Sequence, residues 1–246
     1  MVNMQEISLK AEEIFKVGGF TITNSLLLTF MVTGILVVLS LVIYKKINIV
    51  PGKLQSLVEV AIEKLMDLMK LILGSVEPAE KYLPLIATIF IFIMFSNIIG
   101  VLPGVGSLLH RSGEHSIPLF RSPAADLNFT LAFAMISVFL TNFFGMVSVG
   151  VLVHIKKFLN FSNPINFFVG ILELLSEIAR IISFSFRLFG NVFAGEVLLI
   201  IIFFLVPYIV PVPFVTLELF FGIIQAFIFA ILTLVILALH TTIAEH

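Results

Sequence analysis

The chain has 246 residues, of which 60% are hydrophobic and only 12% are charged, whereas a soluble domain averages roughly a quarter charged residues. The mean hydropathy of +1.19 makes lipid the expected surroundings. Because backbone groups in lipid must pair within a segment, we predict an all-α integral membrane protein. The net charge of −1 offers no basic surface for nucleic acid. The chain has no cysteine and its five histidines are scattered, so we expect no disulfide, no metal site and no cofactor.

Five stretches are long and apolar enough to cross a bilayer core of about 30 Å as helices. They cover residues 25–46, 82–102, 126–153, 164–210 and 213–244. The tail before the first stretch lacks the basic-then-apolar order of a signal peptide, so we expect that stretch to be retained. We expect the second and third stretches to form one hairpin and the last two to form another, within a single domain of 1–246.

Segment 53–74 differs from these stretches because its apolar residues recur at steps of three and four, which is the period of a helix. Its charged residues share the opposite face and are Lys53, Glu59, Glu63, Lys64, Asp67 and Lys70. A helix with this pattern is expected to lie in the plane of the membrane interface. The alternative, a helix packed on a soluble domain, is disfavoured because no soluble domain flanks it.

Lysine and arginine near the ends of membrane spans predict the orientation of the chain. Segment 44–81 carries six lysines and segment 154–163 carries two more. The N-terminal tail and the loop 103–125 carry two basic residues each. This bias places 44–81 and 154–163 on the inner side, the N-terminus outside and the C-terminus inside.

The stretch 164–210 is too long to stand upright in the membrane. A helix of roughly 45 residues would be about 67 Å long, whereas the hydrocarbon core is about 30 Å thick. The helix must therefore break near Arg180 or lie strongly tilted. A tilted helix would present a long seam to a neighbouring subunit.

Arg187 lies deep in this apolar stretch, among the large apolar residues Phe184, Phe186, Leu188 and Phe189. A charged side chain at the bilayer centre costs about 2.5–3.5 kcal/mol on insertion scales, and such residues face protein or water and mark ion paths. The alternative is an arginine that reaches the interface from a helix end. Arg187 is far from the flanking breaks at Pro164 and Pro207, which disfavours that alternative.

One polar stripe follows the same helix. Its members are Glu173, Glu177, Arg180, Phe184, Arg187, Asn191, Ala194 and Gly195, which recur at helical spacing. Small residues at the end of the stripe allow another helix to approach closely, so the stripe predicts a polar conduit at a protein–protein seam. For Glu177 and Arg180 the alternative stays open that the two only neutralise each other near the inner interface.

Two further carboxylates, Glu196 and Glu218, lie in apolar surroundings on either side of the proline-rich turn 207–213. An antiparallel return at this turn would place both on the outer half of the hairpin. Buried carboxylates are suited to take up and pass on protons; the alternative is a structural hydrogen bond. Gln225 lies two helical turns beyond Glu218 and could reach the level of Arg187.

These residues resemble the a subunit of F-type ATP synthases. Arg187-Leu-Phe-Gly-Asn191 followed by Ala194-Gly195-Glu196 is similar to the signature around the essential arginine of that family. Further matches follow in order: Pro51-Gly-Lys-Leu-Gln55, Ser96-Asn97, Leu102-Pro103, Ser122-Pro-Ala-Ala-Asp126-Leu-Asn128-Phe-Thr130, Gln225-Ala-Phe-Ile-Phe229 and Ala244-Glu245-His246. Each short match is weak alone, but the ordered set, which spans 25–246, is specific.

The resemblance implies a rotary mechanism. In this family subunit a lies beside a ring of c subunits, and each ion enters by one aqueous half-channel, rides the ring and leaves by the other. The essential arginine separates the half-channels. Carried over to this chain, Arg187 faces the ring carboxylate, Asn191 lies one turn away and Gln225 supports the arginine.

The same resemblance assigns the remaining polar residues and the partners. Glu196 and Glu218 would line the half-channel from the outside, and Glu173 and Arg180 would lie toward the inner half-channel. The implied partners are the c ring, b-type peripheral-stalk subunits and the rest of the F1Fo ATP synthase. The chain has no GxxxxGK[ST] phosphate loop, so we expect it neither to bind nucleotide nor to be an enzyme on its own.

Three questions stay open at the level of sequence. The transported ion is a proton or, alternatively, sodium, and an unrelated secondary transporter is the rival function, although such transporters commonly show internal repeats and we find none. A bacterial plasma membrane is expected, with an organelle membrane as the alternative. His110, His115 and His240 are expected at the surface with no assigned role.

Overall fold

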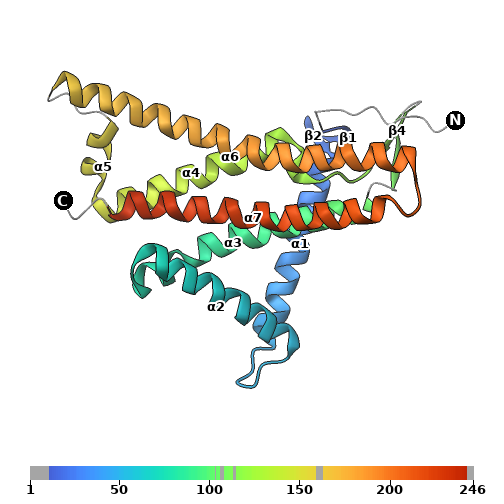
Figure 1. Cartoon of the computed structure of the whole chain (residues 1–246), viewed down its shortest axis with the longest axis horizontal. Coiled ribbons are helices and arrows are strands. Elements are labelled where there is room, and N and C mark those ends of the chain that lie inside the picture. Colours follow the sequence, from blue (N-terminus) through green and yellow to red (C-terminus); the bar gives the residue numbers. More distant parts are fainter. Residues whose placement is uncertain (1–10, 103, 106–107, 113–114, 159–162, 243–246) are drawn as a thin grey trace.

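The computed structural model describes residues 11–102, 104–105, 108–112, 115–158 and 163–242 (Figure 1). In chain order the helices are α1 (Asn24–Lys45), α2 (Lys53–Leu73), α3 (Val76–Val101), the short 3-10 helix η2 (Pro123–Ala125), α4 (Leu127–Val149), α5 (Val151–Phe158), α6 (Pro164–Leu205) and α7 (Pro211–Thr242). Five helices of the described chain, α1, α3, α4, α6 and α7, are long and apolar enough to cross a membrane. The prediction of an all-α membrane protein with five embedded helices and one amphipathic helix is confirmed.

Two short antiparallel hairpins accompany the helices and were not predicted from the sequence. The first pairs β1 (Glu13–Val17) with β2 (Phe20–Thr23), and the second pairs β3 (Leu109–Ser112) with β4 (His115–Pro118). The turn of the first contains Gly18 and Gly19, both with positive φ, a conformation that favours glycine. Both hairpins lie near one end of the α6–α7 pair (Figure 1).

The predicted span 126–153 is in fact two helices. α4 ends at Val149, and Gly150, with φ of +94°, separates it from α5. Because L side chains rarely adopt this φ, the glycine permits the chain to turn sharply and α5 to pack back against α4 and α6. The second span, by contrast, begins earlier than predicted, since α3 starts at Val76 and continues through Pro84.

α6 is one unbroken helix of 42 residues, so of the two expectations for this stretch the break near Arg180 is wrong. At about 1.5 Å per residue the helix is about 63 Å long. α6 and α7 run side by side in opposite directions, and α1 runs steeply across them (Figure 1). This arrangement agrees with a long hairpin that is tilted relative to the first span.

The core lies between α3, α4 and α7, with α2 and α6 packed against them. α2 contributes Leu65, Met69 and Leu73 to this core and keeps its charged residues on the other face. α1 is attached mainly through Leu28 and Val32, and most of its remaining apolar side chains are exposed. In a membrane protein such apolar surface faces lipid or partner subunits.

Candidate ion pathway

Arg187 lies on α6 at the edge between its packed and its open surface. Phe184 and Leu188 beside it are buried in the core, whereas Phe186 is 55% exposed. The Arg187 guanidinium donates a hydrogen bond from Nη2 to Ser183 Oγ at 3.2 Å, and its carbon lies 5.9 Å from the centre of the Phe184 ring. Among the described residues no carboxylate forms an ion pair with Arg187, so within this part of the chain its charge is not neutralised.

Asn191, one turn beyond Arg187, joins α6 to α7. Its side-chain Nδ2 donates to Gln225 Oε1 at 2.7 Å. Gln225 is 2% exposed, and its Nε2 has no hydrogen-bond partner in the described chain. The contact of Gln225 is thus with the asparagine one turn from Arg187.

A cavity of about 270 Å³ opens between α6 and α7 beyond this contact. Its lining includes Asn97, Asn191, Gly195, Glu218 and Gly222. A Cβ atom on Gly195 would lie 2.7 Å from Glu218 Oε1, so the glycine leaves the room that this carboxylate occupies. Glu218 Oε2 is buried with no hydrogen-bond partner among the described residues, and a buried polar atom left unpaired in this way is costly.

Glu196 has a partner that sequence analysis did not identify. Arg121, in the segment before η2, donates from Nε and Nη2 to Glu196 Oε2, both at 3.2 Å, and is itself 8% exposed. Its guanidinium also lies 5.9 Å from the ring centre of Phe193. In the sequence, Arg121 contributes only to the prediction of which side of the membrane its loop occupies. The signal that could have identified its pairing with Glu196 is the need of a buried carboxylate for a cation.

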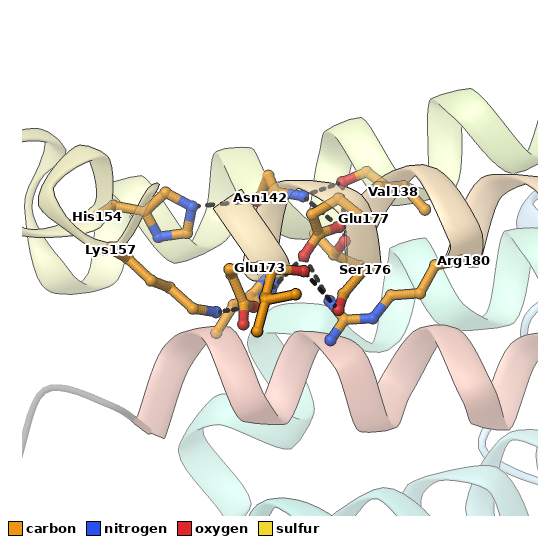
Figure 2. Close-up of polar contacts among 11 residues, drawn as sticks. Val138, Asn142, His154, Lys157, Glu173, Ser176, Glu177 and Arg180 are labelled. Atoms are coloured by element: carbon orange, nitrogen blue, oxygen red, sulfur yellow. Dashed lines mark hydrogen bonds and ion pairs between the residues drawn. The ribbon is translucent and has the colours of Figure 1, made fainter. Parts of the chain in front are cut away.

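Glu173 and Arg180, which were predicted to lie toward the inner half-channel, are at the other end of α6. Each forms an ion pair with a residue of opposite charge. Lys157 of α5 contacts Glu173 at 2.7 Å, and Arg180 forms a close ion pair with Glu177. Figure 2 shows these pairs side by side. Glu177 has further partners, because Asn142 Nδ2 of α4 donates to its Oε2 at 3.2 Å, so its contacts extend beyond the pair with Arg180.

Two histidines complete this inner cluster. His240 is 1% exposed and its Nε2 lies 3.2 Å from Glu177 Oε1, so its predicted surface position is wrong. His154 Nε2 lies 3.1 Å from Asn142 Oδ1. Burial, followed by repulsion from His240 and Lys157, holds the pKa of His154 below its usual value of 6.5. The side chains of the other two predicted surface histidines, at positions 110 and 115, are outside the described residues.

The inner cluster also has the spacing of a metal site. Ligand atoms of Glu173, Glu177 and His240 lie within 4.8 Å of one another. Lys157 and Arg180 already neutralise the two carboxylates, and a divalent cation would be repelled by both. The geometry therefore favours an ion-pair network with a histidine attached to it.

The sequence matches one protein family over most of its length. The family model described as ATP synthase A chain matches residues 26–238. The chain is 37% identical over 218 residues to ATP synthase subunit a of Campylobacter jejuni subsp. jejuni (strain 81-176), a match that covers 87% of this chain and 88% of the relative. It is 38% identical over 237 residues to ATP synthase subunit a of Helicobacter pylori (strain Shi470), covering 92% and 94%. This multi-pass membrane protein therefore belongs to the ATP synthase A chain family.

Proposed function

We propose that this chain is the proton-translocating stator subunit of a rotary F-type ATP synthase, and that Arg187 separates two half-channels. The observation that carries the proposal is the position of an arginine without a carboxylate partner in the described chain, between two polar clusters on one continuous helix. Glu196, Glu218 and the cavity that Glu218 lines lie on one side of it, and Glu173 and Arg180 lie on the other.

The charge of Arg187 suits this role. A guanidinium stays ionised at any working pH, and a nearby cation favours the charged form of a carboxyl group. Arg187 would therefore release the proton from a c-ring carboxyl group that approaches it, and would repel protons that leak directly between the half-channels. Since one charge moved across 100 mV yields about 2.3 kcal/mol, each ATP requires several ions.

The exposed face of α6 beside Arg187 supports a ring partner. Ile182 and Phe186 are 49% and 55% exposed, and Gly190 has open space where a side chain would begin. This face is apolar, has a small residue at the level of the arginine and is not covered by the described chain. We propose that the c ring packs here, with b-type stalk subunits elsewhere on the chain, in a bacterial plasma membrane with the N-terminus outside.

The test is ATP-driven acidification of inverted membrane vesicles that contain the whole synthase. Arg187→Ala should abolish acidification and allow passive proton leak while the complex still assembles. Lys156→Ala, which removes an exposed cation from α5, is the matched control and should pump normally. Coupled pumping retained in Arg187→Ala would contradict the proposal.

The same vesicles separate the rival functions. Pumping that requires sodium in the medium would identify the sodium version of the subunit. Uptake of a small solute by the chain in the absence of its ring partner would identify a secondary transporter. A proton-translocating subunit predicts neither result.

A further inference from the structure

A chain of polar side chains links four helices at the inner end of the hairpin, and the proposed half-channels give none of its four members a role. It runs from His154 on α5 to Asn142 on α4, then to Glu177 on α6 and His240 on α7. The successive separations are 3.1, 3.2 and 3.2 Å. Such a chain in an apolar environment requires each member to be satisfied by the others.

His240 is the least satisfied member of this chain. It is 1% exposed, and its Nδ1 has no partner among the described residues. Its Nε2 lies 3.2 Å from Glu177 Oε1 without the alignment of a hydrogen bond. A buried polar group without a good partner is costly, so its presence calls for a reason other than stability.

Close packing at one glycine holds both histidines in this position. A Cβ atom on Gly145 of α4 would lie 2.9 Å from His240 Cβ and 3.0 Å from His154 Cε1. The two imidazole rings are nearly perpendicular with centres 5.5 Å apart. The absence of a side chain at this position is therefore what lets α7 and α5 bring their histidines together.

The charged residues around His240 pair with one another and leave no net charge for the histidine to neutralise. On α6, Glu173 pairs with Lys157 of α5, and Glu177 pairs with Arg180. His154, the remaining titratable group facing His240, favours its neutral form because burial lowers its pKa. A proton on His240 therefore adds one charge next to the Glu177 carboxylate, and it can be gained or lost without breaking either ion pair.

We propose that Glu177 and His240 form a proton-exchange pair that serves the inner half-channel, an inference that rests on the function proposed above. A proton on Glu177 Oε1 transfers to His240 Nε2, which restores the carboxylate and leaves an imidazolium. Rotation of the imidazolium turns Nε2 away from Glu177, the proton on Nε2 passes to water, and the starting Nδ1–H tautomer remains. Each step is reversible, so the pair serves both directions of proton movement.

In this scheme Glu177, rather than Glu173, is the carboxylate that exchanges protons at the inner half-channel. Lys157 Nζ holds Glu173 at 2.7 Å, whereas the carboxylate oxygen that lies 3.2 Å from His240 Nε2 belongs to Glu177. Glu177 shares its two oxygens among three neighbours, Arg180, Asn142 and His240. Of these, His240 is the one whose side chain has a nitrogen that can both accept and release a proton.

The experiment uses inverted vesicles stripped of the F1 sector, so that the medium bathes the inner side of the membrane. A potassium diffusion potential, negative inside, drives protons through the whole Fo sector while the pH of the medium is varied. Wild type should show a plateau at acidic pH and an inflection between about pH 5 and 8, the interval in which histidine titrates. Above the inflection the flux should fall about tenfold per pH unit with the protonated fraction.

His240→Gln should lose this inflection and conduct about tenfold less than wild type near pH 7, because the residual carboxyl groups protonate only at lower pH. Glu177→Gln should behave in the same way. The matched control is Tyr82→Phe, which removes the 3.0 Å hydrogen bond between Tyr82 and Ser148 near the same end of the bundle and should keep the wild-type profile. A His240→Gln flux reduced by one factor at every pH would mean that the histidine is structural, and would overturn the inference.

Two further measurements keep the result decisive. If His240→Gln does not assemble, the wild-type profile decides, since a wild type without an inflection between about pH 5 and 8 also overturns the inference. Arg187→Ala, measured in parallel with F1 present, distinguishes a failure of the exchange pair from a failure of the proposed function. Loss of coupled pumping in Arg187→Ala together with an unchanged His240→Gln profile would remove the exchange pair and leave the proposed function intact.

Discussion

The side-chain amide of Asn191 donates a 2.7 Å hydrogen bond to Gln225 Oε1, and this contact joins α6 to α7 one turn from Arg187. Both residues lie where the resemblance to the family places support for the arginine. In the structure the contact is one between the two helices: Gln225 accepts a hydrogen bond from Asn191, and Asn191 lies one turn from Arg187.

Gln225→Ala should weaken this joint, because it leaves the Asn191 amide without its acceptor. Loss of a partner from a buried hydrogen bond costs about 1–3 kcal/mol. We expect a lower thermal stability of the purified complex and slower ATP-driven pumping. Thr216→Val is the control, since Thr216 is exposed and bonds only within its own helix. Equal stability of the two variants would show that the joint is unimportant.

Glu196 and Arg121 should behave as one unit. Removing one partner of a buried ion pair costs about 3–5 kcal/mol, so Arg121→Gln should reduce the assembly of the complex in the membrane. The double variant Arg121→Gln with Glu196→Gln should recover part of that loss, because no uncompensated charge is left. A double-mutant cycle on assembled complex measures the coupling, and additive losses would contradict it.

Glu196→Gln alone tests the transport role. If this carboxylate lies on the outer path, the variant should slow proton flux while assembly stays largely intact. Glu218→Gln should do the same, with a larger effect, because Glu218 lines the cavity between α6 and α7. Normal flux in both variants would remove the two carboxylates from the path.

Gly195→Ala should impair flux through a steric effect on Glu218. The new methyl group would lie 2.7 Å from Glu218 Oε1, and overpacking of this kind costs about 1–3 kcal/mol. Shortening the carboxylate with Glu218→Asp in the same chain should restore part of the flux. Gly34→Ala on α1 is the control, because open space surrounds that position in the described chain. No recovery in the double variant would place the defect elsewhere.

Acidification should loosen α5. Because burial and neighbouring positive charge lower the pKa of His154 in the folded protein, the undocked state binds a proton more readily than the docked state. The docked state keeps its full stability above the unfolded value of about 6.5 and loses it as the pH falls through and below that value. Hydrogen exchange of residues 151–158 should rise on acidification in wild type. His154→Gln should remove the pH dependence, and exchange that rises equally in this variant would point to another group.

The sequence predicted the parts of this molecule that depend on local pattern. The long apolar stretches identify the helices, and Arg187 stands out because a charge in such a stretch is costly. The pairing of Arg121 with Glu196 was not predictable, since 75 residues separate them and only the path of the chain through η2 brings them together.

His240 shows why the inner cluster was missed. A histidine near the end of the last helix is normally a surface residue, and nothing in its neighbourhood along the chain indicates burial. It is buried because Gly150 turns the chain into α5 and Gly145 allows the close approach. In the sequence neither glycine indicates a turn or a close approach, since a single glycine is tolerated inside a helix.

The unbroken course of α6 has a consequence for how the chain can evolve or be altered. Glu196 follows Glu177 by 19 residues on one helix, so the two ends of the proposed ion path keep a fixed separation of about 28 Å and a fixed rotational phase. Inserting a single residue between them would turn one cluster by about 100° relative to the other, while seven residues, about two full turns, would nearly restore the phase. Insertions or deletions in this part of α6 therefore preserve the relative orientation of the two clusters only when they add or remove close to a whole number of helical turns.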